Sequence, residues 1–254
     1  MPNQKMFSNV VPLSSEAHGD WSLQMEGGYG FARNLNLMPL VLREMPLAAG
    51  EVPIIFAREG DDIRLFAMLG LKNGENLFVH EDGRWGGSYV PAVLRQYPVV
   101  IGRVKDSDQA FLSIDKSCSG FNQTGDGEAL FDETGAASEF VTKAQKFAKE
   151  FAKSSVLTER FCQTLKDLDI LSPMRISLTA PDGKKREIAG LLTVNREKLK
   201  ALPDDKIKEL TQSNFMELIF VHLQSLSNLR SMASRIPKED GATDLPDVDI
   251  PDLE

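Results

Sequence analysis

The sequence has few of the residues that bind transition metals or cross-link secreted domains. Its 254 residues include two cysteines, Cys118 and Cys162, and three histidines, His18, His80 and His222. The cysteines lie 44 residues apart and outside any metal-binding spacing, and no two histidines are two, three or four residues apart. We therefore expect no bound metal, no cofactor and two free thiols in a reducing compartment.

Long apolar runs and an excess of positive charge are missing as well. The most apolar window, residues 215–226, contains Glu217, His222 and Gln224, so we expect a core helix there and no membrane span. The first twenty residues hold no apolar run of the roughly seven residues that a signal peptide needs, so we expect a cytoplasmic protein. The 29 Lys and Arg residues against 37 Asp and Glu residues give a net charge of −8, which disfavours a nucleic-acid partner.

Composition and length are those of a globular protein. The hydrophobic fraction is 42% and the charged fraction is 26%. We expect a single α+β domain over residues 1–237, in which a strand-rich half, about 1–136, packs on a helix-rich half, about 137–237. Residues 238–254 contain five aspartates and two prolines. Such a composition predicts a flexible acidic tail, with extended docking on the domain as the alternative.

The two halves differ in the period of their apolar residues. In the first half we expect a hairpin of strands at 53–57 and 63–71, further strands at 76–79 and 111–114, a short helix or extended segment at 89–97, and a long loop at 117–138. In the second half, helical spacing predicts a helix at 138–153, a second that carries Phe161 and Leu165 and ends before Pro173, a short one at 204–211 and a last one at 213–235. Strands are expected at 174–180 and 186–194.

One short internal echo suggests a duplicated hairpin unit. Residues 53–77 resemble residues 173–199, for example in Leu69-Gly70-Leu71 and Ala189-Gly190-Leu191. An ancient duplication explains the echo, and chance is the alternative.

Residues that carry catalysis elsewhere are scattered in this chain. His222 lies on an apolar helical face and is expected in the core, whereas His18 and His80 are expected at the surface. Cys118 follows Lys116 in a glycine-containing loop, which favours a reactive thiol, but no histidine partner is placed near it in sequence. The cluster Gly27-Gly28-Tyr29-Gly30 lacks the Lys-Ser or Lys-Thr of a phosphate loop.

Residues 74–98 include the Asn76 amide, the Glu75 carboxylate, the Arg95 guanidinium and the rings of Trp85, Tyr89 and Tyr97. Such a set forms a ligand surface with aromatic walls and a few polar anchors. Its alternative is a buried corner, in which Asn76 caps a turn and Arg95 pairs with Glu75. The binding residues predicted from this stretch are Glu75, Asn76, Trp85, Tyr89, Arg95 and Tyr97.

The order of several motifs resembles the SapC family of bacterial proteins. The motifs are GENLFV, YVPAVLRQYP, GEALFDETG, IAGLLTVNREKLKAL and HLQSLSN, and the resemblance spans about residues 9–230. His80 departs from the family, in which an acidic residue is more common at this place. The family is named for an association with surface-layer proteins. The resemblance implies the fold unit and the positions of these motifs, and it implies no activity and no catalytic residue.

Three functional hypotheses follow. The first is a non-enzymatic binding or accessory protein, whose partner is another protein, a second copy of the chain or a small ligand, and which uses the region from Trp85 to Tyr97. The second is an enzyme or small-molecule-binding protein with a pocket near Asn76, Trp85 and Arg95, to which Glu75, His18 and Cys118 contribute. The third is a surface-layer component.

Overall fold

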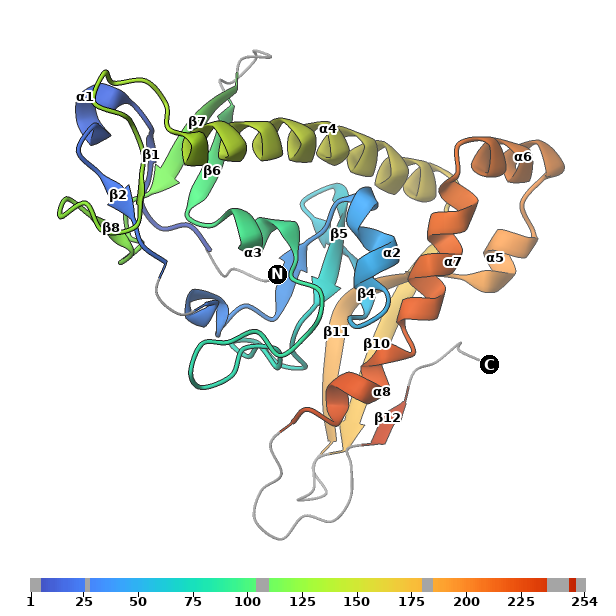
Figure 1. Cartoon of the computed structure of the whole chain (residues 1–254). Coiled ribbons are helices and arrows are strands. Elements are labelled where there is room, and N and C mark those ends of the chain that lie inside the picture. Colours follow the sequence, from blue (N-terminus) through green and yellow to red (C-terminus); the bar gives the residue numbers. More distant parts are fainter. Residues whose placement is uncertain (1–5, 26–27, 104–109, 180–184, 237–246, 250–254) are drawn as a thin grey trace, which may run out of the picture.

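The chain folds into three antiparallel sheets and a set of helices that lie mainly in its second half (Figure 1). The computed structural model describes residues 6–25, 28–103, 110–179, 185–236 and 247–249. Helices make up 38% and strands 24% of the structure. The expected α+β class is confirmed.

The central sheet has six strands in the order β12-β10-β11-β4-β5-β3. Their bounds are Leu37–Pro39 for β3, Ile54–Glu59 for β4, Asp62–Met68 for β5, Leu171–Thr179 for β10, Lys185–Val194 for β11 and Asp247–Asp249 for β12. Strands from both halves of the sequence therefore share one sheet, joined where Leu191 and Leu192 of β11 pair with Ala57 and Phe56 of β4.

Two three-stranded sheets lie at the other end of the molecule (Figure 1). One has the order β1-β7-β6 and is formed by Val10–Pro12, Ala110–Asp115 and Val99–Arg103. The other has the order β8-β2-β9 and is formed by Phe121–Asn122, Ser22–Leu23 and Glu128–Ala129. The segment 117–138, expected as a loop, thus contributes two short strands.

The long helix α4, Glu139–Asp167, crosses β5 and links the two ends of the molecule (Figure 1). Two helices were predicted over this stretch, and that division is wrong. The segment contains neither Gly nor Pro, so nothing interrupts its backbone hydrogen bonds. Near the end of α4, the Phe161 ring lies 6.1 Å from the Phe56 ring and 5.0 Å from the Phe215 ring, so the helix closes the main core.

The other helices and turns are short. They are α1 Ser15–His18, η1 Gly30–Ala32, η2 Leu42–Glu44, α2 Met45–Ala48, α3 Ala92–Gln96, α5 Arg196–Lys200, α6 Asp204–Gln212, α7 Phe215–Ser225 and α8 Asn228–Ala233. The single helix expected at 213–235 is therefore divided into α7 and α8. The hydroxyls of Ser225 and Ser227 donate to the His222 and Gln224 carbonyls at this break, which competes with regular helical pairing.

The strand expected at 76–79 is also wrong. The Asn76 side chain accepts a hydrogen bond from the Phe78 N–H at 2.9 Å and donates to the Ala32 carbonyl at 3.0 Å. A local side-chain bond of this kind favours a turn over a strand. The segment retains only an isolated bridge between Val79 and Trp85.

The two hairpins of the internal echo lie side by side as β4–β5 and β10–β11. The echoing glycines nevertheless occupy different places. Gly70 follows the end of β5, whereas Gly190 lies inside β11 with φ of 84°, where the register to β10 shifts. The echo therefore does not extend to equivalent positions in the two hairpins.

Of the acidic tail, the structure describes Asp247–Asp249, which pair with residues 177–179 of β10 as strand β12. The rest of the segment 238–254 lies outside the described residues, and its flexibility stays a prediction.

Candidate functional site

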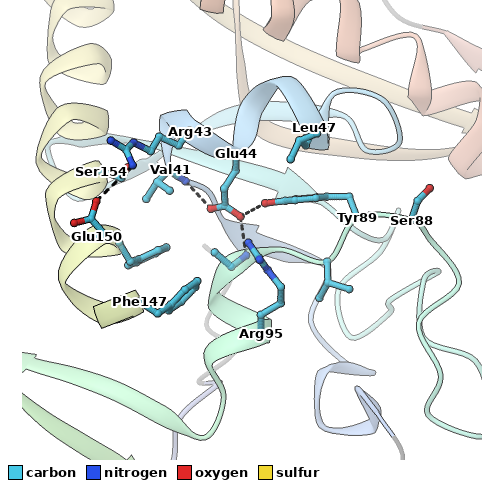
Figure 2. Close-up of a pocket in the computed structure, with 13 residues that line it drawn as sticks. Val41, Arg43, Glu44, Leu47, Ser88, Tyr89, Arg95, Phe147, Glu150 and Ser154 are labelled. Atoms are coloured by element: carbon cyan, nitrogen blue, oxygen red, sulfur yellow. Dashed lines mark hydrogen bonds and ion pairs between the residues drawn. The ribbon is translucent and has the colours of Figure 1, made fainter. Parts of the chain in front are cut away.

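A pocket of about 410 Å³ opens where η2, α2, α3 and α4 meet (Figure 2). We call it the Arg95 pocket. Its wall is mostly apolar, and its volume falls in the range usual for small-molecule sites. Its lining residues are Val41, Arg43, Glu44, Leu47, Ser88, Tyr89, Val90, Ala92, Arg95, Phe147, Glu150, Phe151 and Ser154.

The buried side chain of Glu44 joins three walls of the pocket. Its Oε2 accepts a hydrogen bond from the Val41 N–H at 3.0 Å, and its Oε1 accepts one from the Ala92 N–H at 2.6 Å. The Tyr89 hydroxyl also donates to Oε1, and Figure 2 shows the two side chains pointing toward one another. Burial, together with this hydrogen bond, raises the pKa of the Tyr89 phenol. Tyr89 therefore stays protonated at neutral pH and serves as a donor.

Arg95 supplies the free positive charge of the pocket. Its guanidinium carbon lies 5.8 Å from the centre of the Tyr89 ring and 5.7 Å from the centre of the Phe147 ring. The other cation at the rim, Arg43, lies 3.5 Å from the Glu150 carboxylate. In the part of the chain that the structure describes, no carboxylate forms an ion pair with Arg95. Among the described lining residues, Arg95 is thus a cation that no carboxylate pairs, and its side chain interacts with Tyr89 and with the Phe147 ring.

The loop that carries Tyr89 is fixed from behind by Glu51. The Glu51 carboxylate accepts hydrogen bonds from the Ser88 N–H at 2.7 Å, the Ser88 hydroxyl at 2.6 Å and the Tyr89 N–H at 2.9 Å. Burial would raise the pKa of the Glu51 carboxyl, but these hydrogen bonds and the charge of Arg235 outweigh it, so the pKa lies below its ordinary value. Glu51 is therefore ionised at neutral pH and holds the loop as an acceptor.

Trp85 supports the same loop and does not line the pocket. Its ring stacks on Phe78 at 5.4 Å, and its Nε1–H donates to the Tyr89 carbonyl at 2.9 Å. Arg235 follows the C-terminal end of α8, and its guanidinium carbon lies 4.3 Å from the centre of the Phe78 ring. Trp85 thus belongs to a packed layer behind the Arg95 pocket.

Replacement of Trp85 by alanine is expected to lower the free energy of unfolding by about 2 kcal/mol, because a half-buried aromatic ring and a hydrogen bond are removed. Arg95→Ala is expected to change it by no more than about 0.5 kcal/mol, since Arg95 is exposed. Urea denaturation followed by circular dichroism measures both. Equal stability of Trp85→Ala and the wild type would contradict the packing role.

The structure brings together two of the six predicted binding residues, Tyr89 and Arg95. Glu75 forms an ion pair with Lys72 at 3.0 Å and accepts from the Leu71 N–H at 3.2 Å, so the expected pair between Glu75 and Arg95 is wrong. Asn76 is buried in its turn, away from the pocket lining.

Tyr97 lies instead at a second, polar cavity of about 650 Å³, together with Cys118 and Ser117. The Tyr97 ring stacks on Phe31 at 4.0 Å, and burial raises the pKa of its phenol to about 12. The Cys118 thiol is buried, with its Sγ 3.9 Å from the Met25 Sδ. None of the three histidines lines this cavity, so the cavity holds no nucleophile–base pair of Cys118 with histidine.

The histidines are placed by structural contacts. His222 is fully buried as expected, where its Nδ1 bonds the Ile54 carbonyl at 2.8 Å. His80 is exposed as expected. The surface position expected for His18 is wrong: its ring is buried and meets the Trp21 ring edge-on at 4.9 Å. Trp21, which follows the end of α1, covers the ring.

Sequence reasoning missed the residues that complete the pocket from distant segments. These are Glu44 and Leu47 from η2 and α2, and Phe147, Glu150 and Phe151 from α4. The α4 phenylalanines were recognised only as one apolar helical face. A signal for Glu44 was present, since a glutamate three residues after the start of a helical turn commonly accepts from the first backbone N–H.

The described residues contain no group of three or more His, Cys, Asp or Glu side chains that could hold a metal ion. Within the same residues, no helix combines the length and the apolar character needed to cross a membrane.

The fold and the site define an α+β protein with a largely apolar pocket built around one guanidinium and one buried carboxyl. A sequence profile of the SapC family matches residues 13–232, and the chain therefore belongs to the SapC family. The predicted resemblance is confirmed. No curated protein and no solved structure matched the chain.

Proposed function

We propose that this protein is a non-enzymatic binding protein, and that the Arg95 pocket takes a small anion with an apolar body. The observation that carries the proposal is the exposed guanidinium of Arg95, which lies over two aromatic rings in a largely apolar pocket. A guanidinium presents a planar fork of donors that matches a carboxylate. The rings and Val90 offer apolar contact to the remainder of the ligand.

The polar groups of the pocket support binding rather than catalysis. Glu44 already accepts three hydrogen bonds, and Tyr89 donates to it with a raised pKa. A general base needs a free acceptor whose pKa lies near the working pH. The carboxylate oxygens of Glu44 are already engaged, and the raised pKa of Tyr89 keeps its proton in place, so we assign both side chains to positioning of the pocket walls.

Arg95→Met is expected to weaken the binding of octanoate by at least about tenfold, because a charge-assisted hydrogen bond contributes roughly 1.5–3 kcal/mol. Methionine keeps the apolar stem and the helix propensity of the position. Isothermal titration calorimetry with octanoate measures the dissociation constant, and a thermal melt is expected to change by no more than a few degrees because Arg95 is exposed.

Arg43→Met is the matched control, since it removes a rim cation whose charge is already paired with Glu150. Its octanoate affinity is expected to stay within about twofold of the wild type, in line with the small contribution of exposed ion pairs. Equal binding by the wild type and Arg95→Met, or no binding by the wild type, would contradict the proposed site.

A protein partner or a second copy of the chain is the alternative occupant. It is favoured by Leu47, whose side chain is 68% exposed at the rim of the pocket. Leu47→Ser would weaken such an interface without adding a charge at the mouth of the pocket. A wild-type protein that forms dimers and a Leu47→Ser protein that stays monomeric in analytical ultracentrifugation would favour this alternative. The cytoplasmic location and the surface-layer association stay predictions, which fractionation of the native host would test.

A further inference from the structure

A second apolar cavity lies beside the Arg95 pocket, along the same helix. It has a volume of about 340 Å³ and is bounded by β5, α3 and α4. Val41 and Phe151 line both cavities and therefore form the wall between them. We call this second cavity the α4 cavity.

The interior of the α4 cavity suits an apolar group and no charge. Its lining includes Phe7, Leu40, Phe66 and Val93, and burial raises the pKa of the Cys162 thiol to about 12, so the thiol is neutral. Among the described residues that line it, the one cation is Arg64, which lies 3.0 Å from Glu159 and 3.4 Å from Glu59, two carboxylates of the same lining. That guanidinium is neutralised and does not compete with Arg95 for an anionic group.

We propose that the two cavities hold one ligand, an unbranched long-chain carboxylate. The carboxylate binds Arg95, and the chain passes Phe151 into the α4 cavity. The proposal rests on the proposed function and adds the class of ligand. Phe147 and Cys162 mark the two ends of this path on α4, and at about 1.5 Å per residue they lie ~22 Å apart, which is enough for a long extended chain.

Phe151 is the residue that the chain must pass. Its ring is half-buried and stacks on Phe147 at 6.4 Å. The proposal therefore includes a rotation of the half-buried Phe151 side chain out of the wall between the two cavities. Passage then replaces water in the α4 cavity by methylene groups.

Affinity is expected to rise with chain length in a series of octanoate, dodecanoate and hexadecanoate, titrated below their micelle concentrations. Each methylene removed from water contributes about 0.8 kcal/mol, which corresponds to roughly fourfold in affinity. Incomplete burial reduces this gain. We therefore expect dodecanoate to bind at least tenfold more tightly than octanoate. Dodecyltrimethylammonium has the same chain with the opposite charge, and we expect it to bind at least tenfold more weakly than dodecanoate.

Ser155→Phe on α4 and Val93→Phe on α3 are designed to fill the α4 cavity, since both residues line it and neither lines the Arg95 pocket. Each is expected to abolish the gain from octanoate to dodecanoate and to leave octanoate affinity within about threefold of the wild type. Val156→Phe is the control. It adds the same ring next to Ser155 at a position that is 56% exposed, and it should keep the gain.

The wild-type series decides the proposal even where both filled variants fail to fold. Octanoate binding that depends on Arg95 but does not strengthen with chain length overturns the long-chain ligand and leaves the proposed function intact. Absence of binding by every carboxylate overturns both. A chain-length gain that persists in a folded Ser155→Phe protein places the chain outside the α4 cavity and also overturns the inference.

Discussion

Glu44→Ala is expected to lower the free energy of unfolding by at least about 4 kcal/mol, the largest effect of any single replacement in the site. The variant removes the acceptor of the Val41 and Ala92 N–H groups, both of which lie at buried residues, and of the Tyr89 hydroxyl. A buried donor left without an acceptor costs roughly 1–3 kcal/mol. The three donors come from the residue before η2, the loop before α3 and the first residue of α3, so the variant loses contacts to three walls of the pocket at once.

Two controls identify the cause of this loss. Glu44→Gln keeps one carbonyl oxygen but turns an N–H₂ group toward one of the former donors, so its stability should lie between those of the wild type and Glu44→Ala. Glu51→Ala also removes the acceptor of three hydrogen bonds, but Ser88 is exposed and water replaces the lost acceptor there. We expect about 1 kcal/mol for Glu51→Ala. Equal effects of Glu44→Ala and Glu51→Ala in urea denaturation would contradict the buried role of Glu44.

Local patterns in the sequence predicted elements whose partners are close along the chain. The hairpin of β4 and β5 follows from two apolar runs around Gly60, which takes φ of 63° in the turn. The buried position of His222 follows from its apolar helical face. The paired residues of the hairpin are close along the chain, and the period of the apolar face is enough to indicate that His222 is buried, although its hydrogen-bond partners Ile54 and Val194 are distant in sequence.

Other elements depend on side chains that compete with the backbone, and these were predicted wrongly. Residues 76–79 have the composition of a strand, but the Asn76 amide bonds Ala32, which lies 44 positions earlier in the chain. The last helix breaks near Asn228, whose side chain donates to the Ala49 carbonyl at 2.7 Å. An apolar pattern contains no information on such distant acceptors.

The candidate site likewise contains residues that a local stretch of sequence predicted and residues that it could not predict. Tyr89 and Arg95 were predicted because they lie in one stretch with other aromatic and charged residues, whereas Trp85 and Asn76 of that stretch turned out to support it from behind. Glu44 and Phe147 lie far from the stretch in sequence and reach it through the packing of η2 and α4. Only the folded chain places the guanidinium of Arg95 against a ring from α4.

The stability of the protein is expected to fall by about 3 kcal/mol between pH 7 and pH 4 through His222 alone. Burial lowers the pKa of His222 to about 4 from an ordinary value of 6.5. The unfolded chain therefore takes up a proton near pH 6.5, while the folded chain keeps the ring neutral. The stabilisation is complete above pH 6.5 and is lost as the pH falls toward 4, by about 1.4 kcal/mol for each pH unit between the two pKa values.

The neutral ring is fixed by the bonds it makes in the core. Its Nδ1–H donates to the Ile54 carbonyl at 2.8 Å, and its Nε2 accepts from the Val194 N–H at 3.2 Å and faces the Thr193 hydroxyl at 3.0 Å. With Nδ1 as donor and Nε2 as acceptor, a second proton on the ring would remove the acceptor of a buried N–H and place a charge beside the Phe56 ring in the core.

His222→Gln provides the comparison, because glutamine offers a donor and an acceptor and does not titrate. The wild type and the variant contain the same Asp and Glu residues, whose titration affects both proteins alike. The difference in unfolding free energy between the two proteins should therefore shrink by about 3 kcal/mol from pH 7 to pH 4. His80→Gln, at an exposed position, should follow the wild type at every pH. If urea denaturation shows a constant difference between wild type and His222→Gln across this range, or if the His222 imidazole titrates near pH 6.5 by NMR in the folded protein, then the ring is not held neutral by burial.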